Sequence, residues 1–279
     1  KEIRLLKLVI RQIKKTSVVI FTDLDGTLLN RDTFKFDEIK DYIKSLINEG
    51  ITIIPNTSKT NAELDNFIKE LGFNIPFITE NGSAIHGLNL INKNLPDEII
   101  LGREKELILK IFQKEAPENL RGKCKFITKM EKNMQVKILG LTHNKLKNAL
   151  TRKYSIPILF KGNYEQKKNF FNIIKDIGLS LHEGGRVINL CDKVSKVKAM
   201  NRVVKILKKT EGIVKTIGVG DNYNDLEMLK NSDFPCLVFN DKFLLDTINI
   251  NNCIVSKNLA PNGWQEVVKM ALEKIKLSD

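Results

Sequence analysis

The 279-residue sequence contains few cysteines and no long apolar run. The four cysteines (Cys124, Cys191, Cys236 and Cys253) are far apart and form no C-x-x-C pair, which argues against zinc sites and disulfide frameworks and favours a reducing cytoplasm. No apolar run approaches the roughly 20 residues that cross a membrane. Residues 1–16 are charged throughout and lack the apolar region of a secretory signal. They could form an amphipathic helix or an interface, and the sequence does not decide between these.

Aromatic residues are also scarce, at 7% of the chain, whereas basic residues give a net charge of +13. The excess is concentrated between Ser83 and Asp176, where 19 Lys and Arg accompany only 9 Asp and Glu. Nucleic-acid-binding surfaces usually add stacking aromatics or a known motif to their basic residues, and neither is found here. We therefore expect an anionic small molecule, and not nucleic acid or a membrane, as the partner.

The most informative stretch runs from Val18 to Leu29 and reads VVIFTDLDGTLL. Its first four residues have the length and β-branched content of a buried strand. Asp23 and Asp25 follow at the strand end, and their spacing places both carboxylates on one side of an extended chain. Two like charges this close require a cation or a shared proton, and Mg²⁺ would in turn attract a phosphate. Gly26 allows the sharp turn that follows.

A second polar loop follows the apolar run Ile51–Pro55. Thr60 and Glu63 have the spacing of a capping box that opens a helix. An ordinary helix cap accounts for Thr60 alone, so Thr57 and Ser58 remain to be explained. Hydroxyl groups at a strand end before a helix N-terminus are typical of a phosphate cradle, which we expect here.

The third such loop follows the strand expected at Thr216–Val219 and contains Asp221 and Asp225. Asp221, Asp23 and the carbonyl group of Asp25 would form an oxygen ligand set suited to Mg²⁺. Asp225 would orient these ligands or hold Lys196, whose position at a helix start opposes the helix dipole and indicates an anionic partner.

Strands and helices alternate along both ends of the sequence, which predicts an α/β protein. The middle third differs. There we expect helices at 104–114 and 164–177, strands at 135–139 and 158–160, and a return to the core at 182–190 that is hinged at Gly184 and Gly185. Arg186 beside that hinge would bind a carboxylate or phosphate, or face solvent.

The D-x-D-G-T motif at Asp23–Thr27, after an apolar strand, resembles the first motif of the haloacid dehalogenase superfamily. The resemblance implies a doubly wound parallel (Rossmann-like) core of residues 1–82 and 183–279, with a smaller α+β cap at 83–182. It also implies hydrolysis through an aspartyl-phosphate, with Asp23 as nucleophile and Asp25 as general acid and base. Thr57 and Lys196 would hold the phosphoryl oxygens. Because Val197 replaces the usual glycine, Lys193 and Lys198 remain alternatives to Lys196.

Further stretches resemble the mannosyl-3-phosphoglycerate phosphatase family of the Cof-like branch: T-S-K-T at 57–60, P-F-I-T-E-N-G at 76–82, Gly185-Arg186 and P-N-G-W at 261–264. The resemblance implies Mg²⁺-dependent release of phosphate from mannosyl-3-phosphoglycerate, a step of mannosylglycerate synthesis. Substrate contacts would come from four residues: Ser58, Lys59, Asn81 and Arg186.

One departure from the family pattern leaves the identity of the sugar undecided. The family has an acidic residue where this chain has Ile156, so mannosyl and glucosyl substrates are both possible. A sucrose phosphate phosphatase and a phosphomutase would share the same reacting residues. A basic nucleic-acid-binding module is the non-enzymatic alternative, and the intact set of carboxylates argues against it. The oligomeric state does not follow from the sequence.

Overall fold

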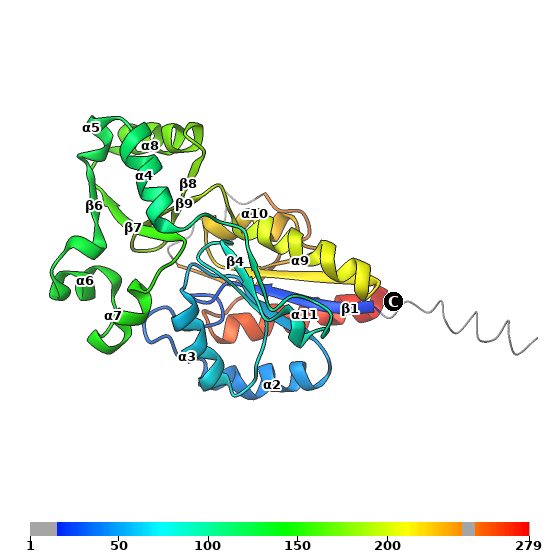
Figure 1. Ribbon diagram of the computed structural model, residues 1–279. Coiled ribbons are helices and arrows are strands. Elements are labelled where there is room, and N and C mark those ends of the chain that lie inside the picture. The colour runs from blue at the N-terminus through cyan, green and yellow to red at the C-terminus, as the bar shows by residue number, and fades with distance from the viewer. Residues whose placement is uncertain (1–15, 242–248, 279) are drawn as a thin grey trace, which may run out of the picture.

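The computed structural model describes residues 16–241 and 249–278, and the N-terminal segment considered above lies outside this range except for Thr16. Its centre is a five-stranded parallel sheet (Figure 1). The strand order across the sheet is β12 (Ile254–Val255), β11 (Phe234–Leu237), β10 (Ile213–Gly220), β1 (Thr16–Thr22) and β2 (Thr52–Pro55). The strand expected from Val18 is β1, which lies inside the sheet between β10 and β2.

Helices cover both faces of this sheet because successive strand residues point to opposite sides. In β1, Ile20 belongs to one apolar cluster, whereas Val19 and Phe21 belong to the other. One face packs against α2 (Lys40–Asn48), α3 (Asn61–Leu71) and α11 (Asn262–Ser278), and the other against α9 (Lys196–Thr210) and α10 (Leu226–Lys230). Trp264 of α11 is fully buried in the first cluster. The doubly wound α/β prediction is confirmed.

A small antiparallel sheet extends this core. It consists of β3 (Phe77–Thr79), β4 (Ala84–His86) and β5 (Glu98–Ile100), and a single bridge between Asn56 and Ile78 joins it to the end of β2. Ile78 and Ile85 pack in the same cluster as α9. Residues 84–100 therefore belong structurally to the core side of the molecule.

The chain between β5 and α9 builds a second body, seen beyond the core in Figure 1, which we call the insertion (residues 103–192). Its antiparallel sheet has the order β6 (Cys124–Phe126), β7 (Ser155–Phe160), β9 (Ile188–Asp192) and β8 (Leu179–Glu183). Its helices are α4 (Lys105–Glu115), α5 (Glu118–Arg121), α6 (Lys132–Leu139), α7 (His143–Leu150) and α8 (Tyr164–Asp176). A separate apolar cluster between the sheet and α4 and α8 stabilises this body.

Two local predictions for the insertion are wrong. Residues 135–139 form part of helix α6, which ends at Gly140 in the left-handed region with φ +63°. A short apolar run fits a strand and a helix equally well, and the C-terminal glycine was the missed signal. Gly184 and Gly185 form the turn of the β8–β9 hairpin, where the Gly184 amide donates to the Val187 carbonyl oxygen, and not a return to the core.

The predicted cap boundaries at residues 83 and 182 stay a prediction. Because β9 pairs with β7 and residues 84–100 pack on the core, we propose that the cap is instead the insertion, residues 103–192. The two connections between the bodies lie together, since Arg103 binds Asp192 through its backbone amide at 2.8 Å and its guanidinium at 2.5 Å. Within the part of the chain that the structure describes, no helix is long and apolar enough to cross a membrane.

Candidate active site

The predicted polar loops meet at the carboxyl edge of the parallel sheet. Asp23 follows β1 directly, and its backbone amide donates to the carbonyl oxygen of Val219 in β10 at 2.9 Å. Gly26 turns the chain with φ +82°, and a Cβ atom there would lie 2.8 Å from an Asp221 carboxylate oxygen. Gly26 is therefore required both for the turn and for the close approach of the two loops.

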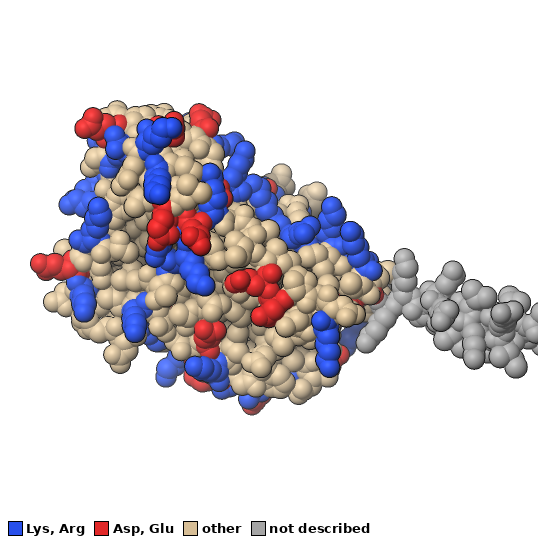
Figure 2. Space-filling view, viewed as in Figure 1, with Lys and Arg blue, Asp and Glu red and all other residues tan. Residues whose placement is uncertain are grey.

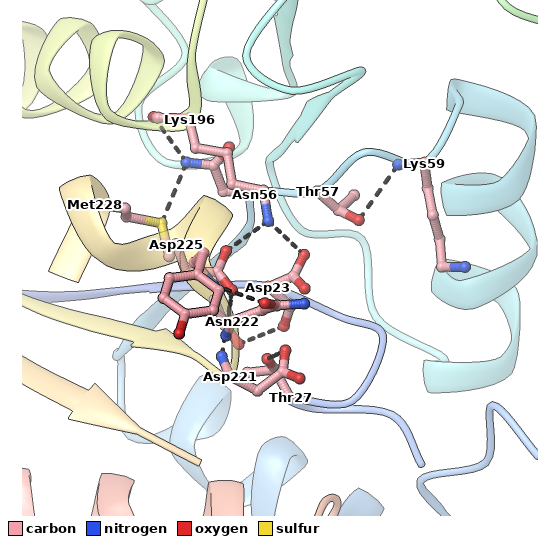
Figure 3. A network of polar contacts seen from close by, with 12 residues as sticks. Asp23, Thr27, Asn56, Thr57, Lys59, Lys196, Asp221, Asn222, Asp225 and Met228 are labelled. Carbon is pink, nitrogen blue, oxygen red and sulfur yellow. Dashed lines mark hydrogen bonds and ion pairs between the residues drawn. The ribbon is translucent and has the colours of Figure 1, made fainter. Parts of the chain in front are cut away.

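Lys196 links two of the predicted carboxylates. It is the first residue of α9 and is 4% exposed, and its Nζ lies 2.7 Å from both Asp23 Oδ1 and Asp225 Oδ1 (Figure 3). Lys193 and Lys198 are exposed. The geometry thus singles out Lys196 among the three candidate lysines. Asp225 is fully buried, and its other oxygen accepts from the backbone amides of Asp221 and Asn222, so it fixes both the lysine and the loop.

Asp221 is surrounded by hydrogen-bond donors. Thr27 donates to one carboxylate oxygen at 2.8 Å, and Arg31 and Asn240 donate to the other at 3.0 and 2.9 Å. Arg31 and Asn240 did not emerge from the sequence, because neither belongs to a motif and the flanking chain gives no apolar pattern that places them. Their positions depend on loops that only the folded sheet brings together.

Burial and mutual repulsion raise the pKa values of two of these carboxyl groups, Asp23 and Asp221. Burial raises the pKa of Asp23 to about 7, against the opposing effect of Lys196, and repulsion from Asp225 and Asp221 adds to the increase. The pKa of Asp221 rises to about 6 for the same reasons, burial first and Asp225 second. The two carboxylates raise the pKa of Lys196 although burial opposes this, so the lysine stays charged.

The loop after β2 lies on the other side of Asp23 and Asp25. The Thr57 hydroxyl group is buried and accepts from the backbone amide of Lys59 at 3.3 Å (Figure 3). The Lys59 ammonium group lies 2.8 Å from Asp25 Oδ2, while Asp25 Oδ1 is buried with no hydrogen-bond partner among the described residues. The capping box of Thr60 and Glu63 forms at the start of α3 as predicted.

A cavity of about 240 Å³ opens above these loops, between the core and the insertion. Asp23, Asp25, Ser58, Lys59 and Asp221 line its core side. The insertion closes the other side with residues from α6, α7, the segment before β7, β9 and the β8–β9 turn, including Arg152, Arg186 and Asn189. Lys and Arg side chains are scattered over the visible face of the insertion (Figure 2), in line with its basic composition.

Two predicted substrate contacts differ in outcome. Arg186 lines the cavity, and its guanidinium carbon lies 5.5 Å from the centre of the Phe34 ring. Asn81 is not among the lining residues in the described ranges: it is buried beneath the loop, and its backbone amide donates to the carbonyl oxygen of Thr57. We therefore withdraw Asn81 as a substrate contact and assign it a role in supporting the Thr57 loop.

Asn56 and Phe34 were not predicted from the sequence either. Asn56 is fully buried at the end of β2, and its amide donates to the carbonyl oxygen of Lys196 at 2.9 Å, which ties β2 to the start of α9. Phe34 has φ +59° and lies within 5.0 to 5.5 Å of the Lys59 ammonium, the Lys145 ammonium and the Arg186 guanidinium carbon, each measured to its ring centre. Asn56 immediately precedes the T-S-K-T stretch, which was the available signal.

The residues present fit a hard divalent cation. Carboxylate oxygens of Asp23, Asp221 and Asp225 lie within 4.8 Å of one another, and two of the three have raised pKa values. Oxygen ligands with surplus negative charge are what Mg²⁺ prefers. Gly26 leaves space beside Asp221 that a side chain would fill.

Comparisons with known proteins agree with this geometry. Residues 20–246 match the model of the haloacid dehalogenase-like hydrolases, and the chain belongs to that family. The resemblance to mannosyl-3-phosphoglycerate phosphatases is confirmed by curated relatives. A glucosyl-3-phosphoglycerate/mannosyl-3-phosphoglycerate phosphatase of Persephonella marina is 30% identical over 92% of this chain and 98% of its own. A protein of the same name from Methanococcoides burtonii is 30% identical over 90% and 95%.

Solved structures show the same fold. Thermoplasma acidophilum 0175 superposes with a TM-score of 0.63 at 15% identity, covering 92% of this chain and 99% of its own. The subclass IIB sugar phosphatase BT4131 has a TM-score of 0.63 at 15% identity, with 91% and 98% covered. The expectation of a phosphatase of the haloacid dehalogenase superfamily is thus confirmed at the level of reaction class.

Proposed function

We propose that the chain is a Mg²⁺-dependent phosphatase that hydrolyses a glycosyl-3-phosphoglycerate through a phosphorylated Asp23. The observation that carries this proposal is the placement of Asp23 at the floor of a cavity, with the Lys196 ammonium on one of its oxygens at 2.7 Å. Lys196 orients this buried carboxylate and partly opposes the effect of burial on its pKa, and a bound Mg²⁺ would further favour the ionised form that attacks.

In the first step, an oxygen of Asp23 attacks phosphorus and the bond to the leaving alcohol breaks, while Asp25 gives its proton to that alcohol. In the second step, Asp25 takes a proton from water as the water oxygen attacks phosphorus; the bond between phosphorus and the Asp23 oxygen breaks, which restores Asp23 and releases inorganic phosphate. The Lys59 ammonium group lies beside Asp25 Oδ2, and an anionic substrate would compete with Asp25 for it.

The backbone and hydroxyl groups of the Thr57 loop, together with Lys196, would hold the phosphoryl oxygens. Asp23, Asp221 and the carbonyl group of Asp25 would bind Mg²⁺, which supplies positive charge that offsets the charge developing on the phosphoryl group. Asp225 positions Lys196 and the Asp221 loop. The four cysteines are free, three of them buried, which is consistent with the cytoplasmic setting that we also propose.

The substrate assignment is supported by the charges around the cavity and by the names of the curated relatives. Arg31, Lys59, Arg152 and Arg186 line the cavity and suit a ligand with both phosphate and carboxylate groups. The relatives' names include both sugars, so we propose a glycosyl-3-phosphoglycerate in which the sugar is mannose or glucose.

Phosphate release with Mg²⁺ tests this proposal across a panel: mannosyl- and glucosyl-3-phosphoglycerate, sucrose phosphate, hexose phosphates and 3-phosphoglycerate. We expect the two glycosyl-3-phosphoglycerates to have kcat/KM at least about tenfold above the others, a difference of about 1.4 kcal/mol. Equal values across the panel would contradict the substrate assignment. Absence of release from every compound would contradict the phosphatase proposal.

A further inference from the structure

Two buried polar atoms on the insertion side of the cavity, Asn189 Oδ1 and Arg152 Nε, have no hydrogen-bond partner among the described residues. Asn189 of β9 is only 3% exposed and lines the cavity, yet its side-chain oxygen accepts no hydrogen bond from any described residue. Arg152, which precedes β7, donates through Nη1 to the carbonyl oxygen of Ser58 at 2.9 Å and to Ser155 Oγ at 3.0 Å. Its Nε is buried and likewise unpaired among the described residues.

Such groups are unusual because a buried polar atom without a partner is destabilising by about 1–3 kcal/mol. Asn56 and Asn81 also have a side-chain atom that is unpaired among the described residues, but they do not line the cavity, whereas Asn189 and Arg152 do. The two unpaired groups lie on walls of the same cavity, so a ligand in that cavity is the natural source of their partners.

The register of the sheet explains why Asn189 faces the cavity. Its neighbours Ile188 and Leu190 belong to the apolar cluster under α4 and α8, and alternation places Asn189 on the opposite face. Ile156 pairs with Leu190 and belongs to that same apolar cluster. The position that departs from the family pattern therefore faces away from the cavity in this chain, and the side chain of Ile156 cannot contact a ligand there.

The chemistry of the two unpaired groups defines what would satisfy them. The amide oxygen of Asn189 needs a donor, and the Nε–H of Arg152 needs an acceptor. Carboxylate and phosphate oxygens only accept, whereas a hydroxyl group both donates and accepts. We propose that Asn189 and Arg152 form a subsite that binds hydroxyl groups of a polyhydroxylated leaving group, such as the sugar ring; this inference rests on the proposed phosphatase function.

The variant Asn189→Ala tests the subsite. Because the amide oxygen has no protein partner, we expect its removal to leave the melting temperature unchanged or to raise it. We expect KM for mannosyl- or glucosyl-3-phosphoglycerate to increase about tenfold, the effect of one lost hydrogen bond to the ligand. KM for 3-phosphoglycerate, which lacks the sugar, should change less than about twofold. Asn172→Ala, on the exposed surface of α8, is the matched control and should change none of these values.

A binding measurement separates this inference from the proposed function. Calorimetry on Asp23→Asn, with and without Asn189→Ala, measures the affinity for the glycosylated and sugar-free compounds without turnover. Weaker binding of the glycosylated compound alone supports the subsite. Equal weakening of both compounds, or no weakening of either, overturns it. Failure of the phosphatase proposal would instead appear as absent phosphate release by the wild-type enzyme.

Discussion

At the scale of single residues, the site is dominated by charges that burial leaves incompletely compensated. Asp23, Asp221 and Asp225 are all at most 7% exposed, and Lys196 and Arg31 are the cations in contact with them among the described residues. The sequence predicted the carboxylates and the lysine, because each lies at a fixed distance from an apolar strand or a helix start. It could not predict Arg31, Asn189 or Asn240, whose positions result from contacts between distant segments.

The raised pKa of Asp23 predicts how the stability of the metal-free protein depends on pH. The folded protein holds this proton up to about pH 7, whereas the ordinary pKa is 3.8, so the stabilising contribution is complete below about pH 3.8 and is lost as the pH rises through about 7. We expect the free energy of unfolding of the wild type, relative to Asp23→Asn, to fall by on the order of 2 kcal/mol between pH 5 and pH 8.

Urea denaturation in the presence of a chelator measures this difference. Asp176→Asn, at an exposed position of α8, serves as the control and should show no comparable dependence on pH. A difference between wild type and Asp23→Asn that stays constant or increases with pH would contradict the charge balance described for the site.

At the scale of elements, the site depends on contacts that hold strand ends and helix starts in register. Asn56 joins β2 to α9 through Lys196, and Trp264 of α11 donates to the Thr22 hydroxyl group at the end of β1 at 2.9 Å. The sequence predicted most of these elements from apolar periodicity. It missed α6 and the β8–β9 turn, because five-residue apolar runs do not determine their own conformation and strand pairing is set by residues far away in the chain.

Replacement of Asn56 by alanine should weaken the junction between β2 and α9. The change removes a buried hydrogen bond and leaves the Lys196 carbonyl group without this donor, so we expect a stability loss of about 1–3 kcal/mol. Misplacement of Lys196 should also lower kcat by about tenfold. Thermal denaturation and steady-state kinetics measure the two effects, with Asn169→Ala on the exposed surface of α8 as control. Wild-type stability together with wild-type kcat would show that this contact does not position the lysine.

At the scale of the whole molecule, the insertion is fastened to the loops that form the floor of the cavity. The buried Glu80 carboxylate accepts from the backbone amides of Lys153 and Tyr154 and from Ser155 Oγ. Arg152 binds the Ser58 carbonyl group, and Thr60 Oγ1 donates to the Asn148 carbonyl oxygen at 2.8 Å. The Thr57 loop is therefore hydrogen-bonded to the insertion, which is consistent with a reaction enclosed between the two bodies.

The presence of an insertion was predictable from the break in strand–helix alternation and from its basic composition. Its limits were not, because β9 lies between β7 and β8 only through long-range pairing, and residues 84–100 return to the core before the insertion begins. The contacts between the core and the insertion could not be predicted from the sequence either. Nothing in the sequence near Glu80 indicates that its carboxylate binds residues 153–155.

The central claim is that Asp23 carries the phosphoryl group during turnover, and the most direct test is to detect it there. The enzyme is mixed with Mg²⁺ and ³²P-labelled glycosyl-3-phosphoglycerate, quenched in acid within one turnover and digested for peptide mapping. We predict label on the peptide containing Asp23, removable by hydroxylamine as expected of an acyl phosphate, and no label on Asp23→Asn. Turnover by the wild type with label on another residue, or phosphate release by Asp23→Asn at the wild-type rate, would contradict the account.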